Sequence, residues 1–303
     1  LLLLCNPLCE AIIKSCLARA QFLHPVTISG FLVEATHVHI LIVVDNPNDI
    51  PGFVRCFKTE SAHMLNRILG RRKRTIWCES FDDPIVLTLP RALMVMVYMY
   101  SNPSKDNLEE SINLYPGVSS WKMFVKGEYK KTWKRLKRND FKLLPKDAHN
   151  LNGYTREAQR VLGQSKQSHD FTISPNAWLE AFGIKSKEEQ EQINNKIIER
   201  IEKVEERAQK KRALEKKQVI GAKVLRNQAF DLTRQSSRAG KRMWCLCEKR
   251  SLRIEFINFL KELFCKARDV RARWELGDFS VPYPPGLYPP AMPKLSEPLS
   301  IWG

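Results

Sequence analysis

The chain has 303 residues, of which 43% are hydrophobic and 27% charged, an ordinary composition for a globular protein. This length suffices for one large domain or for a catalytic domain with an accessory one. Lys and Arg exceed Asp and Glu by 50 to 33, and the formal net charge is +17. Nucleic acid is the commonest partner for such a surplus, with an anionic membrane surface as the alternative. No apolar run approaches the ~20 residues that span a bilayer. Of the two partners we expect nucleic acid and no membrane.

The start of the chain and its cysteines favour a cytoplasmic protein. The opening LLLLC has no basic region before it, so we interpret it as a trimmed start and not as a signal peptide. The eight cysteines form no repeated CxxC pattern, and Cys245 and Cys247 stand too close together for a zinc knuckle. Free buried thiols are the better interpretation.

The first part of the chain predicts alternating helices and strands. Apolar spacing and β-branched runs indicate these elements in chain order: helix 9–21, strand 26–33, turn 34–36, strand 37–44, helix 53–69, a strand within 77–87 and helix 90–101. Asn102-Pro103 should end the last helix, because the residue before proline avoids the helical region. The order predicts an α+β domain with an antiparallel sheet.

Basic and aromatic residues alternate over residues 121–142. Lys and Arg neutralise phosphates, and aromatic rings stack on unpaired bases. We therefore expect DNA contact here and at the basic loop that follows residue 70, against the alternative of a solvated basic helix anchored by its aromatic residues. The DNA-binding candidates are Arg71, Arg72, Lys73, Arg74, Lys122, Lys130, Lys131, Lys134 and Arg135.

The remainder of the chain predicts a mostly helical accessory region. Ser174 is expected to cap a short helix that starts at Pro175, as in small DNA-binding helical units. Residues 187–218 predict a long charged helix with an apolar stripe at Ile193, Ile197, Ile201 and Val204. A further amphipathic helix is expected over 252–274, and the proline-rich residues after it should lie extended along a surface.

Two histidines stand one residue apart inside the strand FLVEATHVHILIVV. Residues i and i+2 of a strand point to the same face, so His37 and His39 project together, with Val38 and Ile40 on the other face. Two imidazoles placed in this way can hold one divalent cation. The alternative is a pair of hydrogen-bonded histidines at a strand edge. A hydrolytic metal site would need a third ligand, for which Glu34 and Glu60 are candidates.

The helix ending VYMYSNP carries a tyrosine and an asparagine four residues apart. Tyr98 and Asn102 therefore share a helical face, whereas Tyr100 points elsewhere. A tyrosine beside a metal can attack a phosphodiester while the metal stabilises the developing charge. Asn102 can add an oxygen ligand. Packing in the core is the alternative for both tyrosines.

HVHILI, the YMYSNP helix end followed by LEESINLYPGVSSW, and the closing DFSVPYPPGLYPP resemble the REP-associated tyrosine transposases, relatives of the single-tyrosine HUH transposases. The resemblance covers about residues 9–121 and returns over 252–293. It implies a ferredoxin-like or RRM-like fold and cleavage of single-stranded or hairpin DNA through a 5′-phosphotyrosine. It also implies Mg²⁺ or Mn²⁺, with Tyr98 as the nucleophile and His37, His39 and Asn102 as metal ligands.

The resemblance, together with the composition, sets the expected domain organisation. Residues 1–121 would form the catalytic domain, with the first strand of the family missing or reduced to LLLLC. A basic linker over 122–170, a helical accessory DNA-binding region over 171–274 and an extended proline-rich tail over 275–303 would follow. We expect a monomer or homodimer with no obligate protein partner.

One motif of the family differs in this chain. Residues 34–36 read Glu-Ala-Thr where the family has Met-Pro-Asn. Three hypotheses therefore stay open: a DNA nicking and joining enzyme, a catalytically inactive relative that binds nucleic acid, and a hydrolytic metalloenzyme that does not use a covalent intermediate.

Overall fold

The computed structural model describes residues 5–34, 36–72, 75–77, 81–230, 243–287 and 289–293. The chain divides into two compact units. The larger unit comprises the described parts of Leu1–Val44, Asp49–Phe81 and Leu89–Lys241, and the smaller one those of Asp45–Asn48, Asp82–Thr88 and Arg242–Gly303. Helices and short sheets occur together in the chain, which confirms the predicted α+β class.

The larger unit begins with a helix–strand–strand–helix segment: α1 (Pro7–Leu23), β1 (Thr27–Val33), β2 (Val38–Val43) and α2 (Asp49–Ile68). These elements match the predicted order. Helix α1 starts two residues earlier than predicted, because the Asn6 side chain accepts a hydrogen bond from Cys9 N at 2.9 Å and Pro7 stands at the first helical position.

Strands β1 and β2 pair in antiparallel fashion, with Leu32 opposite His39 and Val33 opposite Val38. One face of the pair carries Phe31 and Val33, which are buried in the core that α1 and α2 help to form. Val38, Ile40 and Ile42 of β2 pack on the same core. His39 therefore points to the opposite face, as strand alternation predicts.

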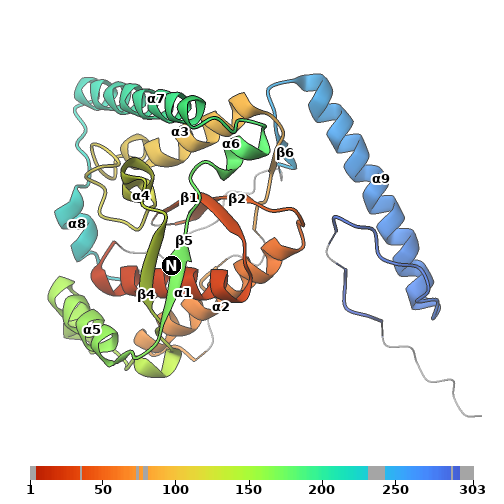
Figure 1. Ribbon diagram of the computed structural model, residues 1–303. Helices are drawn as coiled ribbons and strands as arrows, with labels where there is room; N and C mark the ends of the chain where they lie inside the picture. Colours follow the sequence, from red (N-terminus) through yellow and green to blue (C-terminus); the bar gives the residue numbers. More distant parts are fainter. Residues whose placement is uncertain are drawn as a thin grey trace, which may run out of the picture. The chain divides into compact units, whose positions relative to one another are not determined.

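The second face of the pair meets α3 (Leu89–Lys105). Figure 1 shows β1 and β2 between α1 and α2 on one side and α3 on the other, with α7 (Lys187–Leu214) packed on α3. Gly30 allows the close approach, since a Cβ there would lie 2.8 Å from the hydroxyl oxygen of Tyr100. Ile197 and Ile201 of α7 are buried, which confirms the centre of its predicted apolar stripe.

The edge of β1 that faces away from β2 is covered by two distant segments. Ser120 N donates to Phe31 O at 3.0 Å, and Val33 N donates to Val118 O at 2.9 Å. Further along, Ser174 N donates to Ile28 O at 2.8 Å. The backbone groups of this edge are therefore bonded inside the unit.

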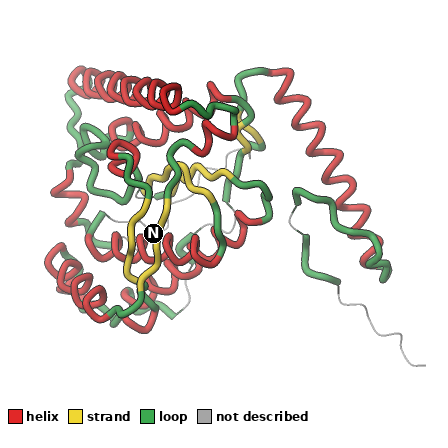
Figure 2. Tube along the Cα trace, in the orientation of Figure 1, coloured by secondary structure: helices red, strands yellow, loops and turns green. Residues whose placement is uncertain are grey.

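The other elements of the larger unit follow in chain order. They are α4 (Trp121–Lys126), β4 (Lys130–Lys134), η1 (Arg138–Asp140), η2 (Lys146–Ala148), α5 (Leu151–Gln164), β5 (Ser168–Thr172), α6 (Ala177–Ala181) and α8 (Ala222–Asn227). Strands β4 and β5 form a second antiparallel pair that packs on α1. Figure 2 shows the two strands as neighbouring yellow tubes, and they form a sheet distinct from that of β1 and β2.

Two local predictions were wrong. Asn102-Pro103 does not end α3, which continues to Lys105. The carbonyls of this last turn find donors, because Asp106 N bonds Asn102 O at 2.8 Å and Arg212 bonds Ser104 O at 2.7 Å. The short helix predicted from Pro175 instead starts at Ala177 with Asn176 as its N-cap, because the chain before it leaves β5 and pairs Ser174 with β1.

The smaller unit contains β3 (Ile85–Val86), β6 (Cys245–Leu246) and α9 (Arg250–Glu275). Strands β3 and β6 pair in parallel. The proline-rich segment after α9 lies along the end of that helix, where Trp274 Nε1 donates to Val281 O at 2.9 Å and the Trp274 and Tyr283 rings lie 5.5 Å apart. The described part of the tail thus packs on the last turn of α9.

The described residues form three two-stranded sheets, so a ferredoxin-like arrangement with one larger sheet stays a prediction. Within the same residues, no helix has both the length and the apolar character needed to cross a bilayer.

Candidate metal centre

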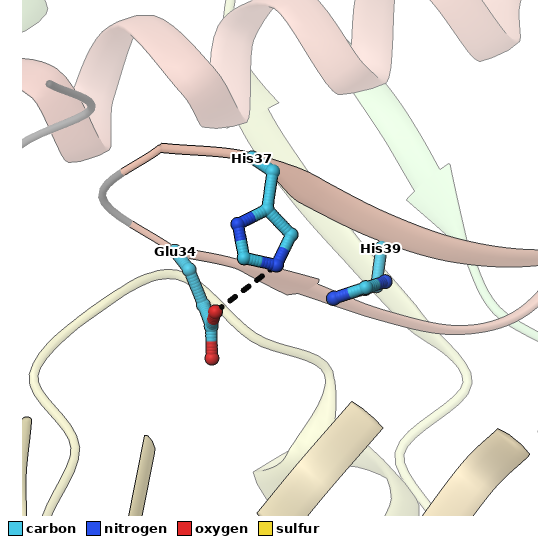
Figure 3. A group of neighbouring side chains, drawn as sticks. All are labelled: Glu34, His37 and His39. Atoms are coloured by element: carbon cyan, nitrogen blue, oxygen red, sulfur yellow. Dashed lines mark ion pairs between the residues drawn. The ribbon is translucent and has the colours of Figure 1, made fainter. Parts of the chain in front are cut away.

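The turn between β1 and β2 brings three potential metal ligands together. Glu34 directly follows β1, and its backbone N–H donates to His37 O at 2.9 Å. This bond closes the turn, so that the Glu34 carboxylate lies on the same side as the imidazoles of His37 and His39 (Figure 3). The predicted common face of the two histidines is confirmed.

The potential ligand atoms of Glu34, His37 and His39 all lie within 4.8 Å of one another. Glu34 Oε2 lies 3.2 Å from His37 Nε2, and the two imidazole rings are 4.5 Å apart at 86°. Glu34 is only 2% exposed, and its Oε1 has no hydrogen-bond partner within the described part of the chain. A buried carboxylate oxygen without a partner is costly, and a bound cation would satisfy it.

The protonation states of the three side chains suit a cation. Burial lowers the pKa of His39 to about 4, aided by His37 and Lys105, and it also lowers the pKa of His37. Both rings are therefore neutral at pH 7 and offer lone pairs. Burial, together with the nearby charge of Asp106, raises the pKa of Glu34 to about 7, against the opposing effect of Lys105. A cation would hold the carboxylate ionised.

Helix α3 supplies the groups that surround His39. Asn102 Nδ2 lies 3.1 Å from His39 Nε2, and the Asn102 side chain is buried. Lys105 Nζ donates to Asn102 Oδ1 at 2.8 Å. The amide nitrogen of Asn102 thus faces the histidine and its oxygen faces the lysine. Because the amide N–H donates to the Nε2 lone pair of His39, metal ligation by His39 and oxygen ligation by Asn102 would both require the amide to turn.

The two tyrosines of α3 have different surroundings. The Tyr98 ring packs edge-on against His39 with the ring centroids 5.7 Å apart, and Lys105 Nζ lies 3.6 Å from the Tyr98 centroid. Tyr98 is 52% exposed. Tyr100 is fully buried and shares a 2.7 Å hydrogen bond with Ser120 Oγ, and its burial raises its pKa. Tyr98 is therefore the tyrosine that the fold brings beside the histidines.

Sequence reasoning proposed two carboxylates as a third ligand, and the structure separates them. Glu34 joins the histidines, whereas Glu60 of α2 pairs with Arg135 at 2.8 Å and belongs to no such group within the described part of the chain. Lys105 was missed as part of the site. Its signal is its spacing, since it stands three residues after Asn102 and seven after Tyr98 on one helical face.

The DNA-binding candidates have varied surroundings. Lys122, Lys134 and Arg72 are exposed, and Arg71 is partly buried. Lys73 and Arg74 lie outside the described residues. Three others form ion pairs: Lys130 with Asp170 at 2.6 Å, Lys131 with Glu128 at 2.8 Å, and Arg135 with Glu60. Arg135 has a side chain only 11% exposed, so it links α2 to the end of β4.

Comparison of the chain with protein-family models, with curated proteins and with solved structures gave no match.

Proposed function

We propose that this protein is a metal-dependent enzyme that nicks and rejoins single-stranded or hairpin DNA through a 5′-phosphotyrosine at Tyr98. This is the activity that its resemblance to the REP-associated tyrosine transposases implies. The observation that carries the proposal is the meeting of Glu34, His37 and His39 within 4.8 Å of one another, with the Tyr98 ring packed against His39. We also propose that the unit that carries these residues has a ferredoxin-like fold.

The cleavage step needs a nucleophile, a bound phosphate and a leaving group. Tyr98 Oη attacks the phosphorus atom, the Tyr–O–P bond forms and the P–O3′ bond breaks. The phenolic proton is released and the 3′ oxygen gains a proton, so the products are a 5′-phosphotyrosine and a free 3′-OH. Attack by a 3′-OH on the phosphotyrosine reverses the step and rejoins DNA. A bound divalent cation would polarise the phosphate and stabilise its developing charge.

The residues around Tyr98 support this step. The ammonium of Lys105 lies 3.6 Å from the centre of the Tyr98 ring, which places a positive charge beside the proposed nucleophile. With its amide turned, Asn102 would present Oδ1 beside His39, either as a metal ligand or as the acceptor that orients the ring.

The donor set bears on the choice of metal. Of the Mg²⁺ and Mn²⁺ that the resemblance implies, Mn²⁺ is the better match for two imidazoles, since it is a transition metal and accepts nitrogen ligands more readily than the hard Mg²⁺ ion. The carboxylate of Glu34 suits either ion.

Incubation with a labelled single-stranded hairpin DNA and Mn²⁺ tests the proposal. We expect a covalent protein–DNA adduct that survives denaturation, disappears with EDTA and disappears in Tyr98→Phe. The exposed Tyr129→Phe is the matched control and should form adduct at the wild-type level. Adduct formation by Tyr98→Phe at that same level would refute the assignment of the nucleophile.

The position of Glu34 favours one second candidate, a hydrolytic metalloenzyme. Two histidines and a glutamate are the ligand set of several catalytic zinc sites, in which metal-bound water is the nucleophile. In that case Tyr98→Phe keeps metal-dependent cleavage and no adduct forms in any variant. An inactive relative that only binds nucleic acid would show neither cleavage nor adduct, with binding that weakens as salt rises.

A further inference from the structure

A basic cavity lies between the C-terminal ends of α3 and α7. Its volume is about 110 Å³, well above the ~15 Å³ that one water requires. The residues that line it are Lys105, Asn107, Ala208, Lys211, Arg212, Glu215 and Lys217. Four of these side chains are cations and one is a carboxylate, so the cavity favours an anion.

The walls of the cavity are fixed by hydrogen bonds. Arg212 is only 4% exposed, and its guanidinium donates to Ser104 O at 2.7 Å and to the Glu110 carboxylate. The chain after α7 is tied back to the end of α3, because Ile220 N donates to Asn107 O at 2.9 Å and Gly221 N donates to Leu108 O at 3.0 Å. An anion would therefore enter a site whose backbone is already ordered.

The lysines at the mouth are more available than Arg212. Lys211 and Lys217 have side chains 75% and 61% exposed, and both lie near the single carboxylate, Glu215, at 3.8 and 2.8 Å. Exposed pairs of this kind are weak, so an incoming anion with more than one oxygen can replace Glu215 as their partner.

Lys105 connects the cavity to the candidate metal centre. It lines the cavity, and its Nζ also donates to Asn102 Oδ1 beside His39. Neighbouring phosphates of one DNA strand are joined through a single sugar. A strand with one phosphate at the metal centre would therefore have other phosphates close by, within reach of Lys105 and the cavity beyond it.

We propose that the cavity between the ends of α3 and α7 binds a backbone phosphate of the same DNA strand that is cleaved at the candidate metal centre. The choice of DNA as the source of the phosphate rests on the proposed function, whereas the preference for an anion rests on the cavity itself. Lys211 and Lys217 contact the phosphate oxygens, Arg212 holds the floor of the cavity through its bonds to Ser104 and Glu110, and Glu215 competes with the ligand.

Binding of DNA without chemistry tests this site. The probe is a labelled single-stranded oligonucleotide of about 16 nucleotides. Its binding is measured by fluorescence anisotropy in the presence of EDTA, which prevents cleavage. The double variant Lys211→Gln/Lys217→Gln should bind about tenfold more weakly than Lys203→Gln/Lys210→Gln, which removes the same charge from α7 outside the cavity. The slope of the logarithm of DNA affinity against the logarithm of salt concentration should become shallower by roughly 0.7 for each phosphate contact that is lost. Equal affinities for the two double variants would overturn the proposal.

A variant that is expected to bind DNA more tightly gives a second test, because misfolding would not raise the affinity. Glu215→Gln removes the competing carboxylate, so we expect it to tighten DNA binding severalfold more than Glu206→Gln, an exposed change of equal charge on the same helix. Blocking the cavity with Ala208→Leu should weaken binding, while the exposed Ala213→Leu should not. The opposite pattern in either pair counts against the cavity.

Two further readouts separate the possible failures. Calorimetric titration with inorganic phosphate shows whether the cavity binds a free anion. If the Lys211→Gln/Lys217→Gln variant loses phosphate binding but binds DNA as its control variant does, DNA is rejected as the source of the phosphate. Adduct formation with Mn²⁺ reports on the proposed function alone. Loss of DNA affinity in the cavity variants without any adduct in the wild type would retain the phosphate site and reject the enzyme.

Discussion

Asn102 Nδ2 and His39 Nε2 lie 3.1 Å apart, although 63 residues separate them in the chain. The contact joins α3 to the β1–β2 turn and holds His39 in a fixed direction. Because Lys105 in turn donates to Asn102 Oδ1, one buried amide connects the histidine to the cation nearest Tyr98.

Replacing Asn102 should weaken metal binding. Removal of a group that orients a metal-bound histidine costs about 10- to 100-fold in affinity, so we expect that loss for Mn²⁺ in Asn102→Ala. Isothermal titration calorimetry with Mn²⁺ measures it, and the exposed Asn195→Ala on α7 is the control. An unchanged affinity would mean that Asn102 neither orients His39 nor ligates the metal.

Glu34 and His39 are expected to bind the metal directly. Glu34→Gln and His39→Ala should each lower Mn²⁺ affinity by at least about tenfold, because the loss of a ligand exceeds the loss of its support. The exposed His63→Ala should bind Mn²⁺ as the wild type does. If Glu34→Gln retains full affinity in a calorimetric titration, Glu34 is not a metal ligand.

The metal affinity should depend on pH through Glu34. Its pKa is raised to about 7, whereas the pKa of His39 is lowered to about 4, so the carboxyl is the last of the two to lose its proton as pH rises. We expect Mn²⁺ affinity to increase from pH 6 to pH 8 in the wild type and to change much less in Glu34→Gln. Titrations at fixed ionic strength measure this, and an equal increase in both proteins would exclude Glu34 as the cause.

The same two groups have opposite effects on the stability of the metal-free protein. The raised pKa of Glu34 means that the folded state binds more protons, so its contribution to stability is lost as pH rises from about 4.5 to about 7. The lowered pKa of His39 means that the folded state binds fewer protons, so stability grows as pH rises from about 4 to 6.5. Urea unfolding of Glu34→Gln should therefore show a steeper gain of stability with pH than the wild type. A shallower gain would contradict the raised pKa of Glu34.

Lys105 should control the charge of its neighbours. It lowers the pKa of both His39 and Glu34, because a positive charge favours the neutral imidazole and the ionised carboxylate. In Lys105→Met we therefore expect both pKa values to rise, as measured by NMR titration of metal-free protein. The exposed Lys196→Met on α7 should leave both unchanged. A fall in the pKa of His39 would contradict the placement of Lys105.

The close packing of β1 against α3 gives a prediction about stability. A Cβ at Gly30 would lie 2.8 Å from Tyr100 Oη and 3.0 Å from Met99 Cε, so Gly30→Ala should lower the free energy of unfolding by about 1–3 kcal/mol. Tyr100→Phe removes one of the clashing atoms, and the double variant should lose less than the sum of the single losses.

Gly163→Ala near the end of α5 is the matched control for Gly30→Ala. No atom lies within 4 Å of an added Cβ there, so the change should stabilise the protein by up to about 1 kcal/mol. Urea unfolding measures the stability of each variant. If the losses of unfolding free energy in Gly30→Ala and Tyr100→Phe are additive in the double variant, the Tyr100 hydroxyl does not crowd β1.

Several features of this protein were determined by the sequence itself because they depend on local periodicity. The alternation of a strand places His37 and His39 together, and the helical repeat places Tyr98 and Asn102 on one face. The same patterns predicted α1, β1, β2, α2 and the long α7 close to their observed bounds.

Other features were decided only by the tertiary structure, because they depend on contacts between residues far apart in the chain. Arg212, 108 residues after Ser104, binds its carbonyl and supports the last turn of α3 past Pro103, which local preference alone would have stopped. The β1–β2 turn places Glu34 beside the two histidines as the third potential ligand, whereas Glu60 pairs with Arg135. The basic cavity exists only where the ends of α3 and α7 meet, since the charge of each lysine can be read from the sequence but its neighbours cannot.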